Sequence, residues 1–179
     1  MKIKSIISIS GRISSGKSYA AQLIQNKFDF PVASFGSYLN YYCEQKNLST
    51  NRKTLQDIGE KLVETNPQQF IIDVVSHFIG NADKIVLEGV RHKLIFEKLK
   101  NITEKHLAIF IDADVQTRYE RYYKRNKDSD EGKTFEQFII SDNHPVELEI
   151  EELKPFCNIV IDSTKEYSDE LFKFILANQ

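Results

Sequence analysis

Short runs of apolar residues rich in β-branched side chains recur along the chain. The first run leads into a glycine, and three later runs end in an acidic residue. Their apolar residues are consecutive rather than alternating, which indicates strands buried on both faces. The expected strands are Ile3–Ile9, Phe30–Phe35, Lys84–Glu88, Leu107–Asp112 and Asn158–Asp162.

Helical patterns fill the intervals between these runs. Strands that alternate with helices predict a parallel sheet covered by helices on both faces, so the expected fold class is α/β. No repeat, low-complexity tract or linker interrupts the pattern, and residues 1–179 are expected to form one domain. The expected helices are Ser18–Lys27, Gly36–Lys46, Arg52–Glu64, Pro67–Ile79, Lys93–Leu99, Val115–Arg125, Val146–Leu153 and Glu166–Ala177.

The interval between the second and third strands, residues 36–80, holds more helix than a simple crossover needs. An excursion of this kind in an α/β domain often carries a second substrate site. The polar stretch 126–133, with a glycine near its end, predicts a loop.

Composition narrows the function classes. Hydrophobic residues make up 41% and charged residues 28% of the 179 residues, the balance of a soluble globular protein. The net charge is −2, so no basic field favours a nucleic-acid polymer. No apolar stretch is long enough to cross a bilayer. We therefore expect neither nucleic acid nor membrane as a partner, and the oligomeric state stays open.

The cysteines and histidines indicate no disulfide scaffold or zinc site. Cys43 and Cys157 are far apart in sequence and form no Cys-x-x-Cys pair, and the four histidines lack metal-ligand spacing. The apolar run from Ser5 to Ile9 is too short for the core of a signal peptide. The expected compartment is the reducing cytoplasm.

Residues 11–18 match the phosphate-binding pattern Gly-x4-Gly-Lys-Ser/Thr between an expected strand and an expected helix. Gly11 and Gly16 let the backbone curl so that its N–H groups point at phosphate oxygens. Lys17 would reach the β and γ phosphates, and the Ser18 hydroxyl would ligate Mg²⁺. The residues expected to bind ATP here are Gly11, Ser14, Ser15, Gly16, Lys17 and Ser18.

Other nucleotide-binding classes fit less well. Residues 126–129 read Asn-Lys-Asp-Ser, which lacks the final Asp of a guanine-reading motif. A large motor ATPase would need more chain and an Asp-Glu pair at a strand end, which is absent. Small kinases remain.

Three further segments resemble nucleoside and deoxynucleoside monophosphate kinases, the adenylate kinase-like small P-loop kinases. Residues 33–39 look like the strand-Gly-helix entry to their acceptor site, and residues 87–91, Leu-Glu-Gly-Val-Arg, look like their turn in which an acidic residue and a glycine precede an arginine. Arg118-x-x-Arg121-x-x-x-Arg125 resembles their lid helix. The resemblance covers roughly residues 1–165 and implies strand order 2-3-1-4-5, ATP, Mg²⁺ and a lid over about 118–133.

Two positions depart from this family pattern. Asn40 stands where many members have an acceptor-binding arginine, and Val90 replaces the usual proline. Both leave the identity of the acceptor open.

Acidic and basic residues near strand ends are the remaining candidates for chemistry. Arg91 would clamp the acceptor phosphate, and Glu88 would hold a Mg²⁺-bound water, unless the two form a surface ion pair. Arg121 and Arg125 would contact ATP phosphates across the transition state, and Arg118 would bind ATP, unless the three form a solvated helix face. The expected catalytic residues are Lys17, Arg91, Arg121 and Arg125, and the expected metal ligands are Ser18 and Glu88.

The acceptor site is expected at the start of the excursion. Gly59 lies inside an expected helix, where glycine costs about 1 kcal/mol against alanine. Either an acceptor base or another helix packing closely there would explain it. The expected acceptor-binding residues are Ser34, Phe35, Gly36, Arg52, Gly59 and Arg91.

The leading hypothesis is ATP-dependent transfer of a phosphoryl group to a small phosphate-bearing acceptor, first of all a nucleoside or deoxynucleoside monophosphate. The alternative within kinases is a hydroxyl acceptor such as dephospho-coenzyme A, which benefits from a carboxylate that takes its proton. The second strand lacks such a carboxylate, although Asp57 keeps this alternative open. A non-catalytic nucleotide-binding switch is the alternative of another class.

Overall fold

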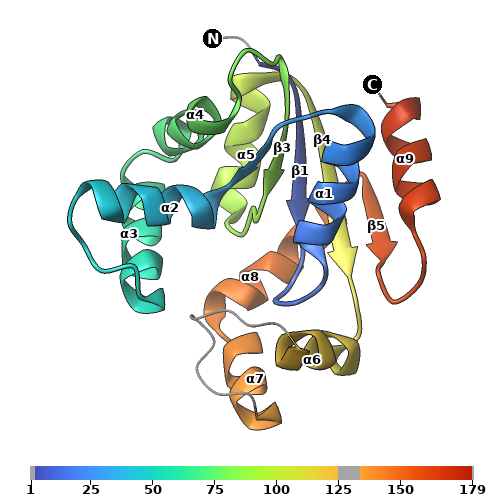
Figure 1. The fold of residues 1–179 in the computed structure, drawn as a ribbon. Helices are drawn as coiled ribbons and strands as arrows, with labels where there is room; N and C mark the ends of the chain where they lie inside the picture. The colour runs from blue at the N-terminus through green and yellow to red at the C-terminus, as the bar shows by residue number, and fades with distance from the viewer. Residues whose placement is uncertain (1–2, 125–133, 179) are drawn as a thin grey trace.

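The computed structural model describes residues 3–124 and 134–178. A five-stranded parallel sheet forms its centre, in the order β2-β3-β1-β4-β5 (Figure 1). The predicted order 2-3-1-4-5 is therefore confirmed. The strands are β1 (Ile3–Ser10), β2 (Val32–Ser34), β3 (Lys84–Glu88), β4 (Thr103–Asp112) and β5 (Ile159–Asp162).

Helices cover both faces of this sheet. The helices are α1 (Lys17–Phe28), α2 (Phe35–Gln45), α3 (Arg52–Thr65), α4 (Pro67–Phe78), α5 (Lys93–Ile102), α6 (Val115–Lys124), α7 (Phe135–Asp142), α8 (Pro145–Leu153) and α9 (Ser168–Ala177), with a 3₁₀ turn at Lys154–Phe156. Helices α4 and α5 pack on one face and α1 and α9 on the other. Ile6 of β1 lies in the first core and Ile7 in the second, which is why the strand reads as a continuous apolar run.

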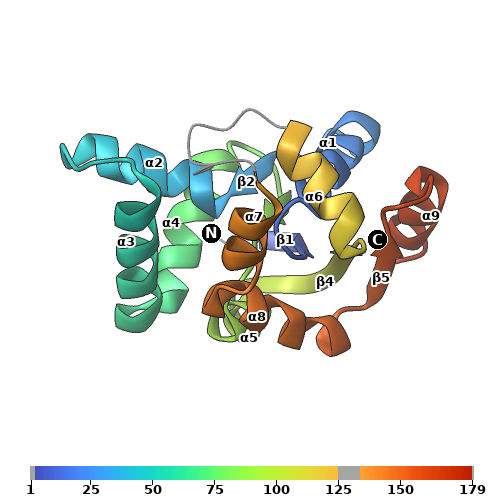
Figure 2. The same ribbon diagram turned by 90° about the horizontal axis from the view of Figure 1, so that it is seen from below.

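The helices of the excursion extend to one side of the sheet (Figures 1 and 2). They are α2, α3 and α4, as residues 36–80 predict. Helix α2 begins at Phe35 rather than Gly36, because Ser34 caps it by accepting a hydrogen bond from the Ser37 backbone N–H.

Helix α7 has no counterpart among the predicted helices. It begins with a capping box in which Thr134 and Gln137 bond reciprocally to each other's backbone N–H, a signal that the sequence carries. The predicted lid, residues 118–133, starts on α6 and continues into residues outside the described part of the chain. Arg125 also lies outside the described part.

All strands end at the same edge of the sheet, where α6, α7 and α8 lie (Figure 1). The register pairs Glu88, the last residue of β3, with Ile9 of β1, and Asp162, the last residue of β5, with Asp112 at the end of β4. Ligands of open parallel sheets bind at this edge. Among the described helices, none combines the length and the apolar character needed to cross a membrane.

Candidate active site

The loop between β1 and α1 has the conformation of a phosphate cradle. Gly11 has φ 146°, and a Cβ at this position would collide with the carbonyl oxygen of Ile111 on β4. Gly16 has φ 101° and forms the N-cap of α1. Neither backbone conformation suits a residue with a side chain, which accounts for the two glycines of the motif.

The polar groups of the loop include one ammonium and two buried hydroxyls. Lys17 Nζ donates to the carbonyls of Gly11 at 2.7 Å and Arg12 at 2.8 Å, so the ammonium lies back across the loop. The hydroxyl oxygens of Ser14 and Ser15 are buried and have no hydrogen-bond partner in the described part of the chain. Buried unsatisfied hydroxyls are costly, and phosphate oxygens are acceptors that would satisfy them. The loop therefore fits a polyphosphate.

Ser18, in the first turn of α1, lies beside Glu88 at the end of β3. Its hydroxyl donates a hydrogen bond of 2.6 Å to the Glu88 carboxylate. The described residues contain no group of three or more His, Cys, Asp or Glu side chains that could hold a metal ion. A hydroxyl with one carboxylate fits Mg²⁺, which takes its other ligands from water and substrate phosphates. The expected pair of metal ligands is thus brought together.

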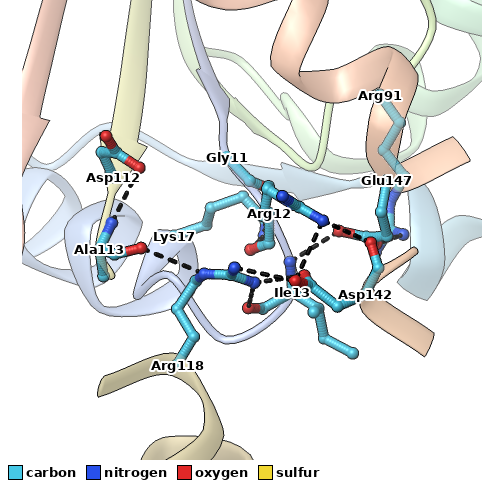
Figure 3. A network of polar contacts seen from close by, with 10 residues as sticks. All are labelled: Gly11, Arg12, Ile13, Lys17, Arg91, Asp112, Ala113, Arg118, Asp142 and Glu147. Carbon is cyan, nitrogen blue, oxygen red and sulfur yellow. Dashed lines mark hydrogen bonds and ion pairs between the residues drawn. The ribbon is translucent and has the colours of Figure 1, made fainter. Parts of the chain in front are cut away.

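Arg118 on α6 is buried, with its side chain only 5% exposed. Its guanidinium forms a bidentate ion pair with Asp142 at the end of α7, and its Nε donates to the Ala113 carbonyl at 3.1 Å (Figure 3). The Arg12 side chain of the phosphate loop also reaches Asp142, at 3.0 Å. Arg118 therefore braces α6 and α7 around the loop, which differs from the direct ATP contact expected from the sequence.

A second buried carboxylate lies on the other side of the same loop. Glu147, in the first turn of α8, accepts from the Ile13 backbone N–H at 2.7 Å and from Arg91 Nη1 at 2.9 Å (Figure 3). Its side chain is 3% exposed, whereas that of Arg91 is 42% exposed. The expected acceptor clamp is therefore next to the phosphate loop and partly open to solvent. Neither Glu147 nor Asp142 was among the candidates from the sequence.

Arg121 joins the phosphate loop to the turn after β5. It donates to the Ser15 carbonyl at 3.1 Å and to Ser163, at 2.9 Å to the hydroxyl and 2.6 Å to the carbonyl. Nearby, burial raises the pKa of Tyr167 to about 12. The Tyr167 hydroxyl is buried and has no hydrogen-bond partner among the described residues. Arg121 thus lies at the cradle, and its predicted contact with ATP phosphates stays a prediction. The structure adds Tyr167 to its surroundings.

The acceptor-side candidates are more dispersed. Ser34 and Gly36 flank Phe35, whose ring packs on Phe70 of α4 with centroids 5.2 Å apart. A Cβ on Gly59 would lie 3.1 Å from the Leu39 side chain of α2. Of the two explanations for this glycine, the structure therefore favours the neighbouring helix. Arg52 is the first residue of α3, directly after its cap, Asn51.

The two residues that depart from the family pattern have local roles. Asn40 donates to the Gly36 carbonyl within α2, at 3.0 Å. Val90 is buried, and its carbonyl accepts from the Ser10 hydroxyl at 3.0 Å, which ties the turn after β3 to the end of β1. This tie holds the turn that carries Arg91 against the start of the phosphate loop.

Comparison with known proteins identifies the family and the fold. A protein-family model described as an AAA domain matches residues 7–148, which is most of the chain. The chain belongs to this AAA domain family. A UPF0200 protein of Pyrobaculum aerophilum is 22% identical over 175 residues, which cover 96% of this chain and 97% of that protein.

A dephospho-CoA kinase of Borrelia garinii subsp. bavariensis is 31% identical over 101 residues of this AAA domain protein. That match covers 54% of the chain and 46% of the kinase, so it spans less than half of the relative's length. Among solved structures, shikimate kinase from Acinetobacter baumannii in complex with shikimate superposes with a TM-score of 0.64 at 12% identity, covering 99% and 95% of the two chains. The AAA domain protein thus has the fold of small P-loop kinases.

Proposed function

We propose that this protein transfers the γ-phosphoryl group of ATP to a small phosphate-bearing acceptor, with a nucleoside or deoxynucleoside monophosphate as the preferred class. The observation that carries the proposal is the position of Arg91. Arg91 comes three residues after Glu88, the partner of Ser18, and it is partly exposed next to the phosphate loop. A guanidinium there can bind an acceptor phosphate bidentately.

The donor half of the reaction rests on the loop between β1 and α1. Backbone N–H groups of the loop and the N-terminus of α1 bind phosphate oxygens, and Lys17 exchanges its loop carbonyls for the β and γ phosphates. Ser18 and Glu88 would hold Mg²⁺, which neutralises charge on those oxygens when bound. Arg121 lies at the same loop and would stabilise the charge of the transferring group.

The acceptor half needs orientation more than acid–base chemistry. An acceptor phosphate oxygen forms the new bond to the γ-phosphorus while the bond to the bridging oxygen breaks, and that electron pair leaves with ADP. An ionised acceptor phosphate has no proton to remove, so it needs no general base. Strand β2 ends at Ser34 and is followed by Phe35, without a carboxylate. This supports a phosphate rather than a hydroxyl as the attacking group.

The similarity to part of a dephospho-CoA kinase supports a second candidate, transfer to a hydroxyl of a phosphate-bearing coenzyme precursor. A hydroxyl acceptor would require a base, and Asp57 on α3 is an exposed carboxylate within the acceptor-side excursion. An Asp57→Asn variant would then lose transfer to dephospho-coenzyme A, whereas transfer to a monophosphate would be unaffected.

The deciding experiment is an ADP-release screen with Mg²⁺·ATP and a panel of nucleoside and deoxynucleoside monophosphates plus dephospho-coenzyme A. We expect ADP to form only when one of the monophosphates is present. The matched control is Lys17→Ala, which lacks the ammonium of the cradle and should release no ADP with any acceptor. Preference for dephospho-coenzyme A would favour the second candidate. ATP binding without ADP release for every acceptor would favour a non-catalytic switch.

A further inference from the structure

Glu147 is the one described carboxylate that bonds both to the phosphate loop and to Arg91. Its Oε2 accepts from the Ile13 backbone N–H at 2.7 Å, and its Oε1 accepts from Arg91 at 2.9 Å. The two donors come from opposite sides of the proposed reaction, since Ile13 belongs to the donor loop and Arg91 to the turn after β3 (Figure 3). Moving this carboxylate would therefore disturb both.

The Glu147 carboxylate is buried, so it depends on both of its hydrogen bonds. The Glu147 side chain is 3% exposed. A buried carboxylate is costly unless charge and hydrogen bonds compensate it, and Arg91 with Ile13 supplies that compensation. Because each oxygen serves a different donor, neither an amide nor a shorter acid can reproduce both contacts.

Glu149, the next acidic residue along α8, only links α8 to a neighbouring helix. Glu149 bonds to the His92 ring at 3.1 Å and to the Lys93 backbone N–H at 2.9 Å, so it holds α8 to the start of α5. Neither of these bonds involves the phosphate loop or Arg91. Glu149 is thus a matched control for Glu147 on the same helix.

We propose that Glu147 is a positioning residue that couples the two halves of the active site. It fixes the phosphate loop at Ile13 and orients the guanidinium of Arg91 through a single carboxylate. The coupling to the acceptor side rests on the proposed function, because that function gives Arg91 its acceptor. The effect on ATP binding does not, because it depends only on the loop.

Calorimetric titration with Mg²⁺·ATP, without any acceptor, tests the loop contact. Glu147→Gln leaves an amide NH₂ facing one of two N–H donors, so we expect ATP affinity to fall about tenfold, the scale of one lost hydrogen bond to a charged group. Glu147→Asp keeps the charge but is one methylene shorter, and we expect the same loss of ATP affinity in it. It serves as the test variant if Glu147→Gln does not fold. Glu149→Gln should stay within about twofold of the wild type.

Thermal unfolding tests the link to Arg91. Arg91→Ala strands the buried Glu147 charge and should lower the Tm by roughly 5 °C. Adding Glu147→Gln removes that charge, so the double variant should be more stable than Arg91→Ala alone. If Glu147 only held α8 in place, the double variant would be less stable than Arg91→Ala alone.

Wild-type ATP affinity in both Glu147 variants would overturn the proposal, as would a double variant no more stable than Arg91→Ala. Equal losses of ATP affinity in Glu147→Gln and Glu149→Gln would also overturn it, because the effect would then follow from the packing of α8 as a whole. A wild type that binds ATP but uses no acceptor would refute the proposed phosphotransfer and leave the binding result standing. A wild type that binds no ATP would refute both.

Discussion

The hydroxyl of Ser18 donates a 2.6 Å hydrogen bond to the carboxylate of Glu88. This contact joins the first turn of α1 to the end of β3, two elements that the chain separates by the whole α2–α4 excursion. It follows from parallel pairing, because β1 and β3 are neighbours with Ile9 opposite Glu88. The sheet thereby places one hydroxyl and one carboxylate at the mouth of the phosphate cradle.

Glu88→Gln should raise the Mg²⁺ concentration needed for half-maximal ADP formation by about tenfold or more, because an amide is a weaker ligand for hard cations than a carboxylate. ATP binding measured without Mg²⁺ should be nearly unchanged. Metal titration of both forms at saturating ATP makes the comparison. An unchanged Mg²⁺ requirement would remove Glu88 from the metal site.

Arg91→Lys should lower kcat as well as weaken acceptor binding, with a loss of about 2–4 kcal/mol in transition-state stabilisation. Lysine offers a point charge without the bidentate fork, so the acceptor phosphate loses its orientation. ATP affinity should stay nearly constant, because lysine keeps a positive charge beside Glu147. If ATP binding collapses instead, Arg91 belongs to the donor site.

Arg118→Ala should destabilise the fold more than it affects nucleotide binding. Removing it leaves Asp142 with Arg12 alone at the junction of α6, α7 and the phosphate loop. Breaking a buried pair costs about 3–5 kcal/mol, which denaturant unfolding would measure. Arg121→Ala, at a half-buried position, is the comparison and should instead weaken ATP binding more than stability. The opposite ranking would favour the phosphate contact for Arg118.

Stability should fall in acid because of His106. Burial lowers the pKa of this imidazole to about 4, below its ordinary 6.5, and its Nε2 lies 2.8 Å from the Ser8 hydroxyl. The folded state thus binds fewer protons than the unfolded state between these values. Its contribution to stability is present above pH 6.5 and is lost as the pH falls toward 4, about 3 kcal/mol in all. His106→Asn should flatten this part of the pH profile of the unfolding free energy.

Local patterns predicted most of the fold. The apolar runs of β1, β3 and β4 identified buried strands, and the glycine spacing identified the loop that Gly11 and Gly16 shape. Helix α7 was missed because its capping signal, Thr134 with Gln137, follows directly on the polar stretch 126–133, and no helix was predicted between that stretch and Val146.

The bracing of the site was not predictable in the same way. The spacing of Arg118 and Arg121 places both near one face of α6, but it does not reveal that Arg118 meets Asp142 from another helix. Glu147 reads in the sequence as an ordinary acid in the first turn of a helix. Its contact with Ile13 spans most of the chain, and no periodicity within a segment reports a tertiary contact of that range.

The hold of α7 and α8 on the phosphate loop has a consequence for the order of folding. Residues 11–18 are synthesised first, yet Arg12 and Ile13 receive their carboxylate partners only from Asp142 and Glu147. Contacts of such long sequence separation form late, because the intervening chain must be closed before they are gained. A nascent chain that has built β1 and α1 therefore carries the nucleotide motif before it has a rigid nucleotide site. We expect ATP to bind tightly only to chains in which α7 and α8 have already packed against the phosphate loop.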